Sequence, residues 1–167
     1  LSTFMAGNMT SNNLAKALIY PRTLGTSITT IFGTGIQTFI TSVLPAYGST
    51  TSGIDVEFID AVDGKKKYCQ VKAGPQTLNG DDVETIHRHF NAAKNTGKTN
   101  NVKFTSDSFV IGVLYGTYSD LSANYINLER EHFYPVYAGQ TFWHRLTGDT
   151  QFYQKLINRF AQVATST

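Results

Sequence analysis

The eight-residue run SFVIGVLY, at residues 108–115, constrains the fold more than any other feature of the sequence. Its apolar side chains are continuous, whereas a strand with one solvated face alternates apolar and polar residues. Continuous apolar runs of this length are typical of strands buried on both faces. We therefore expect residues 108–115 to form a central strand that is covered by other elements above and below.

A β-hairpin is predicted between residues 54 and 73. Apolar and polar side chains alternate from Ile54 to Ile59, which predicts a strand. Asp63-Gly64 favours a two-residue turn, and Lys66–Ala73 would then return as the partner strand. Two polar pairs follow from this turn, namely Glu57 opposite Gln70 and Asp55 opposite Lys72. The alternate residues would point together into the core: Val56, Phe58, Cys69 and Val71.

Helical spacing and short apolar runs predict the remaining elements. The longest amphipathic helix is expected from Ile28 to Leu44, and its other face is polar but uncharged, as suits a second subunit, DNA or a covered surface within the monomer. Asp81 and Glu84 would cap a later helix. The other predictions are a helix near residues 13–20, that later helix from Asp82 to Asn95, a strand at Phe133–Tyr137, and helices at Thr141–Leu146 and Asp149–Ala164.

This order of elements predicts an α/β fold with a mixed central β-sheet flanked by helices on both faces. A chain of 167 residues with 41% apolar composition fits one domain. We expect a single domain over residues 1–167, in which a helical N-terminal segment, residues 1–52, precedes a catalytic α/β core, residues 53–167.

Composition narrows the class of protein. No apolar run reaches the length of a membrane span, and the opening LSTFMAGNMTSNN lacks the pattern of a secretory signal. The single cysteine, Cys69, can form neither an internal disulfide nor a cysteine zinc site. We therefore expect a soluble intracellular protein. Residues 1–54 contain Lys16 and Arg22 but no acidic residue, which favours a polyanionic ligand, although a merely polar helical segment is the plain alternative.

The hairpin is also the predicted active site. Asp55, Glu57, Gln70 and Lys72 would converge on one face, within roughly 5 Å across the strands. Phosphodiester hydrolysis uses a divalent cation held by oxygen ligands. Asp55, together with Glu57 or Gln70 and the Val71 carbonyl, could supply them, while Lys72 would contact the scissile phosphate, orient the attacking water or act as a general base. The alternative is an exposed Asp55–Lys72 ion pair worth at most about 1 kcal/mol.

Gly53-Ile54-Asp55, a hairpin and Gln70-Val71-Lys72 together resemble the PD-(D/E)xK nuclease motif, with Gln70 where that motif usually has an acid. Four longer segments are similar to a family of type II restriction endonucleases that cut interrupted GC-rich palindromes, and the similarity spans residues 13–160. They are SGIDVEFIDAVDGKKKYCQVKAGPQTLN, ALIYPRTLGTSI, IGVLYG and FWHRLTGD.

This resemblance implies Mg²⁺-dependent cleavage of double-stranded DNA by a homodimer in the cytoplasm of a prokaryotic cell. The run Lys65–Lys67 would form a charged hairpin tip. The candidate DNA contacts are Arg22, Lys65, Lys66, Gln76 and Arg88. Two alternatives stay open: a structure-selective or repair nuclease of the same fold, and a DNA-binding module whose active site has decayed, for which Gln70 is the best argument.

Overall fold

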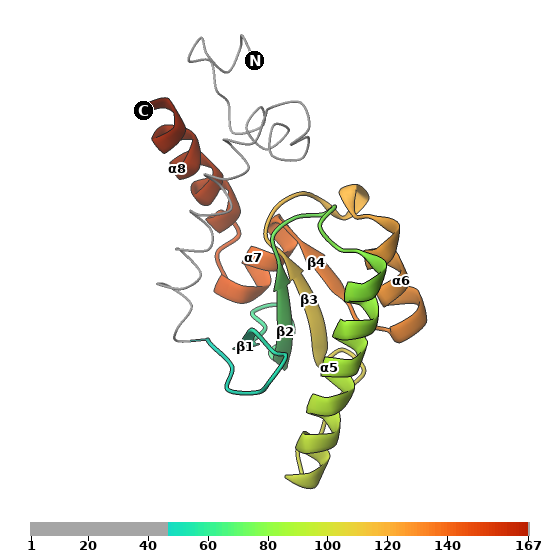
Figure 1. Ribbon diagram of the computed structural model, residues 1–167. Coiled ribbons are helices and arrows are strands. Elements are labelled where there is room, and N and C mark those ends of the chain that lie inside the picture. The colour runs from blue at the N-terminus through green and yellow to red at the C-terminus, as the bar shows by residue number, and fades with distance from the viewer. Residues whose placement is uncertain (1–46, 167) are drawn as a thin grey trace.

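The computed structural model describes residues 47–166 of the chain (Figure 1). The helices predicted near residues 13–20 and at Ile28–Leu44, like the candidate DNA contact Arg22, lie outside the described residues, and the division into segments at residue 52 stays a prediction. The elements, in chain order, are β1 (Val56–Ile59), β2 (Lys66–Lys72), α5 (Gly80–Thr99), β3 (Phe109–Val113), the 3-10 helix η1 (Tyr118–Asp120), α6 (Ala123–His132), β4 (Val136–Ala138), α7 (Gln140–Thr147) and α8 (Phe152–Ser166).

The strands form one mixed sheet in the order β1-β2-β3-β4. β1 runs antiparallel to β2, whereas β2, β3 and β4 are parallel to one another. Every residue of β3 is buried, which confirms the predicted central strand. Parallel neighbours require a crossover connection; α5 crosses from β2 to β3, and α6, which was not predicted, crosses from β3 to β4.

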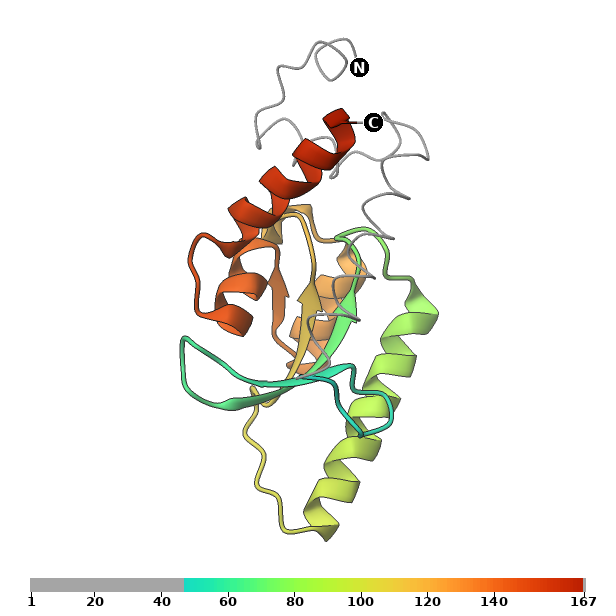
Figure 2. The same ribbon diagram turned by 90° about the vertical axis from the view of Figure 1, so that its left-hand side faces the viewer.

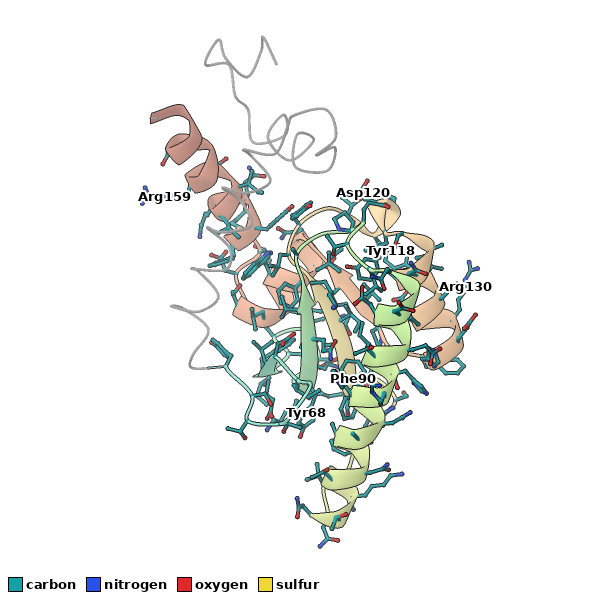
Figure 3. All side chains as sticks on the ribbon, viewed as in Figure 1. Tyr68, Phe90, Tyr118, Asp120, Arg130 and Arg159 are labelled. Atoms are coloured by element: carbon teal, nitrogen blue, oxygen red, sulfur yellow. The ribbon has the colours of Figure 1, made fainter. Side chains whose placement is uncertain are left out.

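Helices cover both faces of the sheet, as predicted. α5 and α6 lie on one face and α7 and α8 on the other (Figures 1 and 2). Tyr68 and Phe90 mark the α5 side in Figure 3. On the α7 side, the indole N–H of Trp143 donates to the Leu114 carbonyl at 2.8 Å. No helix among residues 47–166 is long and apolar enough to cross a membrane.

The hairpin forms, but its register differs from the prediction by two residues. Glu57 pairs with Tyr68 instead of Gln70, and β1 begins with Val56 opposite Cys69. The Asp55 N–H, just before β1, also donates to the Cys69 carbonyl, so the predicted Asp55–Lys72 pair is wrong too. Because side chains alternate, a shift by two residues moves no side chain to the other face. Glu57, Gln70 and Lys72 therefore still share a face.

Asp60 explains the shift. Its buried carboxylate accepts a hydrogen bond from the Val62 N–H at 2.8 Å and forms an ion pair with Arg145 at 2.6 Å. The Asp60 N–H donates to the Lys65 carbonyl at 2.9 Å. The connection is thus a four-residue loop, residues 61–64, rather than a two-residue turn. An Asp that bonds the main chain two residues on is a common way to start such a loop.

The start of α5 was also misplaced by two residues. Asn79 caps the helix, and Asn79 and Asp82 form reciprocal side-chain to main-chain hydrogen bonds, both of 2.9 Å. The predicted cap, Asp81 with Glu84, is therefore wrong. This capping box begins α5 only a short loop after β2, so the helix runs back along the sheet beside the hairpin.

Candidate active site

Asp55 sits at the end of the hairpin that is opposite its tip. Its N–H donates to the Cys69 carbonyl at 2.9 Å, and its carboxylate accepts from the Val71 N–H at 2.7 Å. The main chains of Tyr68 and Lys72 form hydrogen bonds on the β3 side of β2. Because main-chain groups of successive residues face opposite sides of a strand, the main chain of Val71 faces the β1 side. β1 pairing does not extend to Val71, and its carbonyl therefore lies on the same sheet edge as the Asp55 carboxylate.

Gln70 is buried, with 7% of its surface exposed, and its amide has a defined orientation. The Nε2 group donates to the Gly53 carbonyl at 2.6 Å and lies 3.0 Å from Nδ1 of His89 on α5. Both contacts are made by the nitrogen, so the Oε1 atom is left as an acceptor. No described residue donates a hydrogen bond to it.

Lys72 ends β2, two residues beyond Gln70 on the same face. Its carbonyl accepts from the Leu114 N–H at 3.0 Å, which fixes the main chain at this point. The side chain is half-buried, yet its ammonium has no ion pair or hydrogen bond with any residue of the described range 47–166. An ammonium group that has no partner and lies beside oxygen ligands can bind an anion such as a phosphate.

Glu57 is already engaged in other contacts. Its carboxylate forms an ion pair with Lys66 at 2.8 Å and accepts from the Ser49 hydroxyl at 2.6 Å. Burial alone raises the pKa of Glu57, but the hydrogen bonds from Lys66, Ser49 and Thr51, with the charge of Lys66, together hold the pKa below its ordinary value. Glu57 also lines a cavity of about 190 Å³ with Thr96. Thr96 lies about two turns, roughly 10 Å, along α5 from His89.

The predicted DNA contacts differ in the partners of their side chains. Lys65 and Lys66 are exposed and form ion pairs with Asp107 and Glu57. Gln76 is exposed and donates to the Asp120 carbonyl. Arg88 is exposed on α5, and no partner for its guanidinium is found in the described part of the chain.

The third lysine of the predicted charged tip is not at the surface. Lys67 is fully buried, and its ammonium forms ion pairs with Asp63 at 2.9 Å and Asp107 at 3.0 Å. The register explains this position, because Lys67 pairs with Phe58 and shares the inward face of the hairpin with Cys69.

Sequence reasoning missed Gly53 and His89 as parts of the site. The sequence pattern placed Gly53 only in the motif segment before Asp55, and it gave His89 no role. Helical spacing did contain a signal for His89: it follows the buried Ile86 by three positions and precedes the buried Ala93 by four. A residue with that spacing lies beside the buried face and can reach the sheet.

The site offers oxygen ligands of the kind that Mg²⁺ prefers. They are the Asp55 carboxylate, the Gln70 Oε1 atom and the Val71 carbonyl. Among the described residues no group of three or more His, Cys, Asp or Glu side chains could hold a metal. A cation at this edge would therefore have one acidic ligand and otherwise neutral oxygens, which still fits a hard cation that keeps part of its water shell.

Comparison with known protein families identifies a family for this chain. The profile of the family described as type II restriction endonuclease EcoO109I matches residues 3–167 of the chain. No individual curated protein matches the chain. The matched segment covers nearly the whole sequence, including the hairpin, α5 and the four strands described in residues 47–166. The mixed sheet covered by helices on both faces agrees with a restriction-endonuclease-like fold. The chain therefore belongs to the type II restriction endonuclease EcoO109I family.

Proposed function

We propose that this chain is a sequence-specific endonuclease that hydrolyses DNA phosphodiester bonds with Mg²⁺ at the open end of the hairpin. The observation that carries the proposal is the combination of uncommitted groups there. Among the described residues, Lys72 has no partner for its ammonium, Gln70 Oε1 has no donor, and the Asp55 carboxylate accepts one hydrogen bond, that of the Val71 N–H. Family membership supports the nuclease class independently of these contacts.

In this proposal, Asp55, Gln70 Oε1 and the Val71 carbonyl hold the cation. When bound, Mg²⁺ supplies positive charge that offsets the negative charge developing on the phosphate. The Asp55 carboxylate is already fixed by the Val71 N–H, so little of its freedom is lost when ligands arrive. Lys72 binds a phosphate oxygen or orients the attacking water, and its position at the end of a sheet strand favours a defined geometry.

The DNA contacts proposed from the sequence are Arg22, Lys65, Lys66, Gln76 and Arg88. The side chains of Lys65 and Lys66 are 52% and 50% exposed, and ion pairs at that exposure are weak. Both lysines can therefore exchange their carboxylate partners for DNA phosphates at little cost. The proposed assembly is a homodimer, because cutting both strands of a palindrome requires two active sites. The proposed location is the cytoplasm of a prokaryotic cell.

Digestion of an unmethylated plasmid tests the proposal. With Mg²⁺, the protein should give discrete fragments, and it should give none when EDTA is added. A smear, or cutting confined to branched or damaged substrates, would favour the structure-selective or repair nuclease. DNA binding without any cleavage in Mg²⁺ or Mn²⁺ would favour the decayed binding module. Analytical ultracentrifugation of the full chain tests the homodimer.

A further inference from the structure

Gln70 occupies a position where the nuclease motif usually has an acid, and its surroundings give a reason. Its amide nitrogen meets two acceptors at once, the Gly53 carbonyl at 2.6 Å and the His89 Nδ1 atom at 3.0 Å. We propose that Gly53 and His89 form an amide-selective clamp, which requires glutamine at position 70 and fixes the direction of its Oε1 atom. The inference rests on the proposed function, since it deepens the role of Gln70.

The Gly53 carbonyl is the selective half of the clamp. A main-chain carbonyl can only accept hydrogen bonds. In this geometry the amide nitrogen satisfies it, whereas an ionised glutamate would place a carboxylate oxygen against the carbonyl oxygen at about the same separation. Gln70 is 7% exposed, so water has little room to relieve that repulsion. The usual acid of the motif is therefore disfavoured at position 70 by the structure around it.

His89 is the orienting half of the clamp. Its Nδ1 atom lies against the nitrogen that donates to Gly53, so Nδ1 serves as the acceptor and the neutral ring carries its proton on Nε2. Rotating the amide by half a turn would put Oε1 against the Gly53 carbonyl and remove both bonds. His89 thus acts as a positioning residue: it holds the amide, and the amide presents Oε1.

The main chain at Gly53 is shaped for this contact. Its φ is +78°, in the left-handed region, and a Cβ atom added there would lie 2.6 Å from both Cβ and Cγ of His89. Any larger residue would be strained in its backbone and would push His89 away. The glycine therefore allows the carbonyl of residue 53 and the ring of residue 89 to reach the same amide nitrogen.

The first test replaces glutamine by the residue that is usual in the motif. Binding of Mn²⁺ to the DNA-bound protein is measured by isothermal titration calorimetry, beside cleavage in Mg²⁺. We expect Gln70→Glu to weaken Mn²⁺ binding and cleavage by about tenfold or more, because supporting contacts around a ligand contribute 10- to 100-fold to metal affinity. Equal or tighter Mn²⁺ binding by the folded variant would overturn the clamp.

The second test separates the orienting role of His89 from simple packing. His89→Asn keeps an acceptor near the position of Nδ1, whereas His89→Leu keeps bulk but removes the acceptor. We expect the leucine variant to need about tenfold more Mn²⁺ for half-saturation and the asparagine variant to recover most of that loss. Equal Mn²⁺ affinity of His89→Leu and wild type, with both folded by circular dichroism, would also overturn the clamp.

These tests distinguish failure of the clamp from failure of the proposed function. If the wild-type chain binds Mn²⁺ but never cleaves DNA, the proposed function fails and the clamp is still judged by the calorimetric ratios. If the wild type cleaves and the ratios are unchanged, only the clamp fails. If the wild type binds no Mn²⁺ at all, both fail.

Discussion

The two ends of the hairpin carry similar residue types, but these residues have different partners at each end. At the tip, Asp60 pairs with Arg145, and Lys67 pairs with Asp63 and Asp107. At the open end, Asp55, Gln70 and Lys72 keep oxygen or ammonium groups that no described residue satisfies. Charge at the tip holds the hairpin loop to Arg145 on α7 and to Asp107 just before β3, and charge at the open end is left available for a ligand.

The contrast shows which charged residues matter for stability and which for chemistry. Buried ionised groups are tolerated in proteins when they are paired, and removing one partner is costly. Polar groups with unused bonding capacity contribute little to stability, so their arrangement on one sheet edge calls for a functional explanation. Substitutions at the two ends should therefore have opposite effects on folding and on cleavage.

Asp55 should give a large loss of cleavage at the open end. Asp55→Asn retains an acceptor for the Val71 N–H but removes the negative charge, so we expect cleavage to fall by about 10²- to 10³-fold with the free energy of unfolding within about 0.5 kcal/mol of wild type. Steady-state cleavage and urea unfolding measure the two quantities. An asparagine variant that cuts at half the wild-type rate would break the comparison.

Lys67 should give the opposite result at the tip. Lys67→Met keeps the bulk of the buried side chain but leaves Asp63 and Asp107 without their shared cation. We expect a loss of about 3 kcal/mol in the free energy of unfolding, with cleavage per folded molecule close to wild type at low temperature. Lys98→Ala, an exposed change near the end of α5, serves as the matched control and should leave both quantities unchanged.

The tip also predicts a pH dependence of stability. A hydrogen bond from Thr105, followed by that of Lys67, lowers the pKa of Asp107. For Asp63 burial alone would raise the pKa, but the hydrogen bonds from Lys67 and the Lys65 N–H, with the charge of Lys67, together lower it. Carboxyls with lowered pKa stabilise the fold above their ordinary pKa of about 3.9, and this contribution is lost as pH falls through the folded values. Urea unfolding between pH 5 and about 2 should show that loss, and Lys67→Met should reduce it.

Glu57 should give the smallest effect on metal use. Its carboxylate is held by Lys66 and Ser49, so Glu57→Gln should change the Mg²⁺ dependence of cleavage by less than about twofold, as expected for a partly exposed ion pair away from the ligands. A Mg²⁺ titration of cleavage provides the measurement. A tenfold shift in the Mg²⁺ concentration for half-maximal cleavage would instead support Glu57 as a metal ligand, the alternative that the sequence alone left open.

The sequence predicted the fold where a pattern determines the element. The continuous apolar run predicted the buried central strand, and alternation placed Glu57, Gln70 and Lys72 on one face. The register was wrong because it depends on Asp60 and its ion pair with Arg145, which is distant in sequence. α6 was missed because only two of its residues, Tyr125 and Leu128, are buried, too few to give a clear apolar stripe.

The candidate site, like the fold, could be predicted only where a local sequence pattern determines it. Asp55, Gln70 and Lys72 could be chosen from their spacing on two adjacent strands. The contacts that orient Gln70 could not, because they bring together Gly53 before the hairpin and His89 on a helix. Such contacts depend on how α5 packs across the sheet, and no local pattern specifies that packing.

Cleavage of a large unmethylated DNA by wild type and by Lys72→Ala, with the cut ends mapped, tests the central claim most directly. The lysine has no described partner to lose, so the variant should unfold at the wild-type urea concentration within error. We predict wild-type ends at one recurring sequence in Mg²⁺ and no detectable cleavage by Lys72→Ala. Ends at the same sequence produced by the folded variant at the wild-type rate would contradict the account.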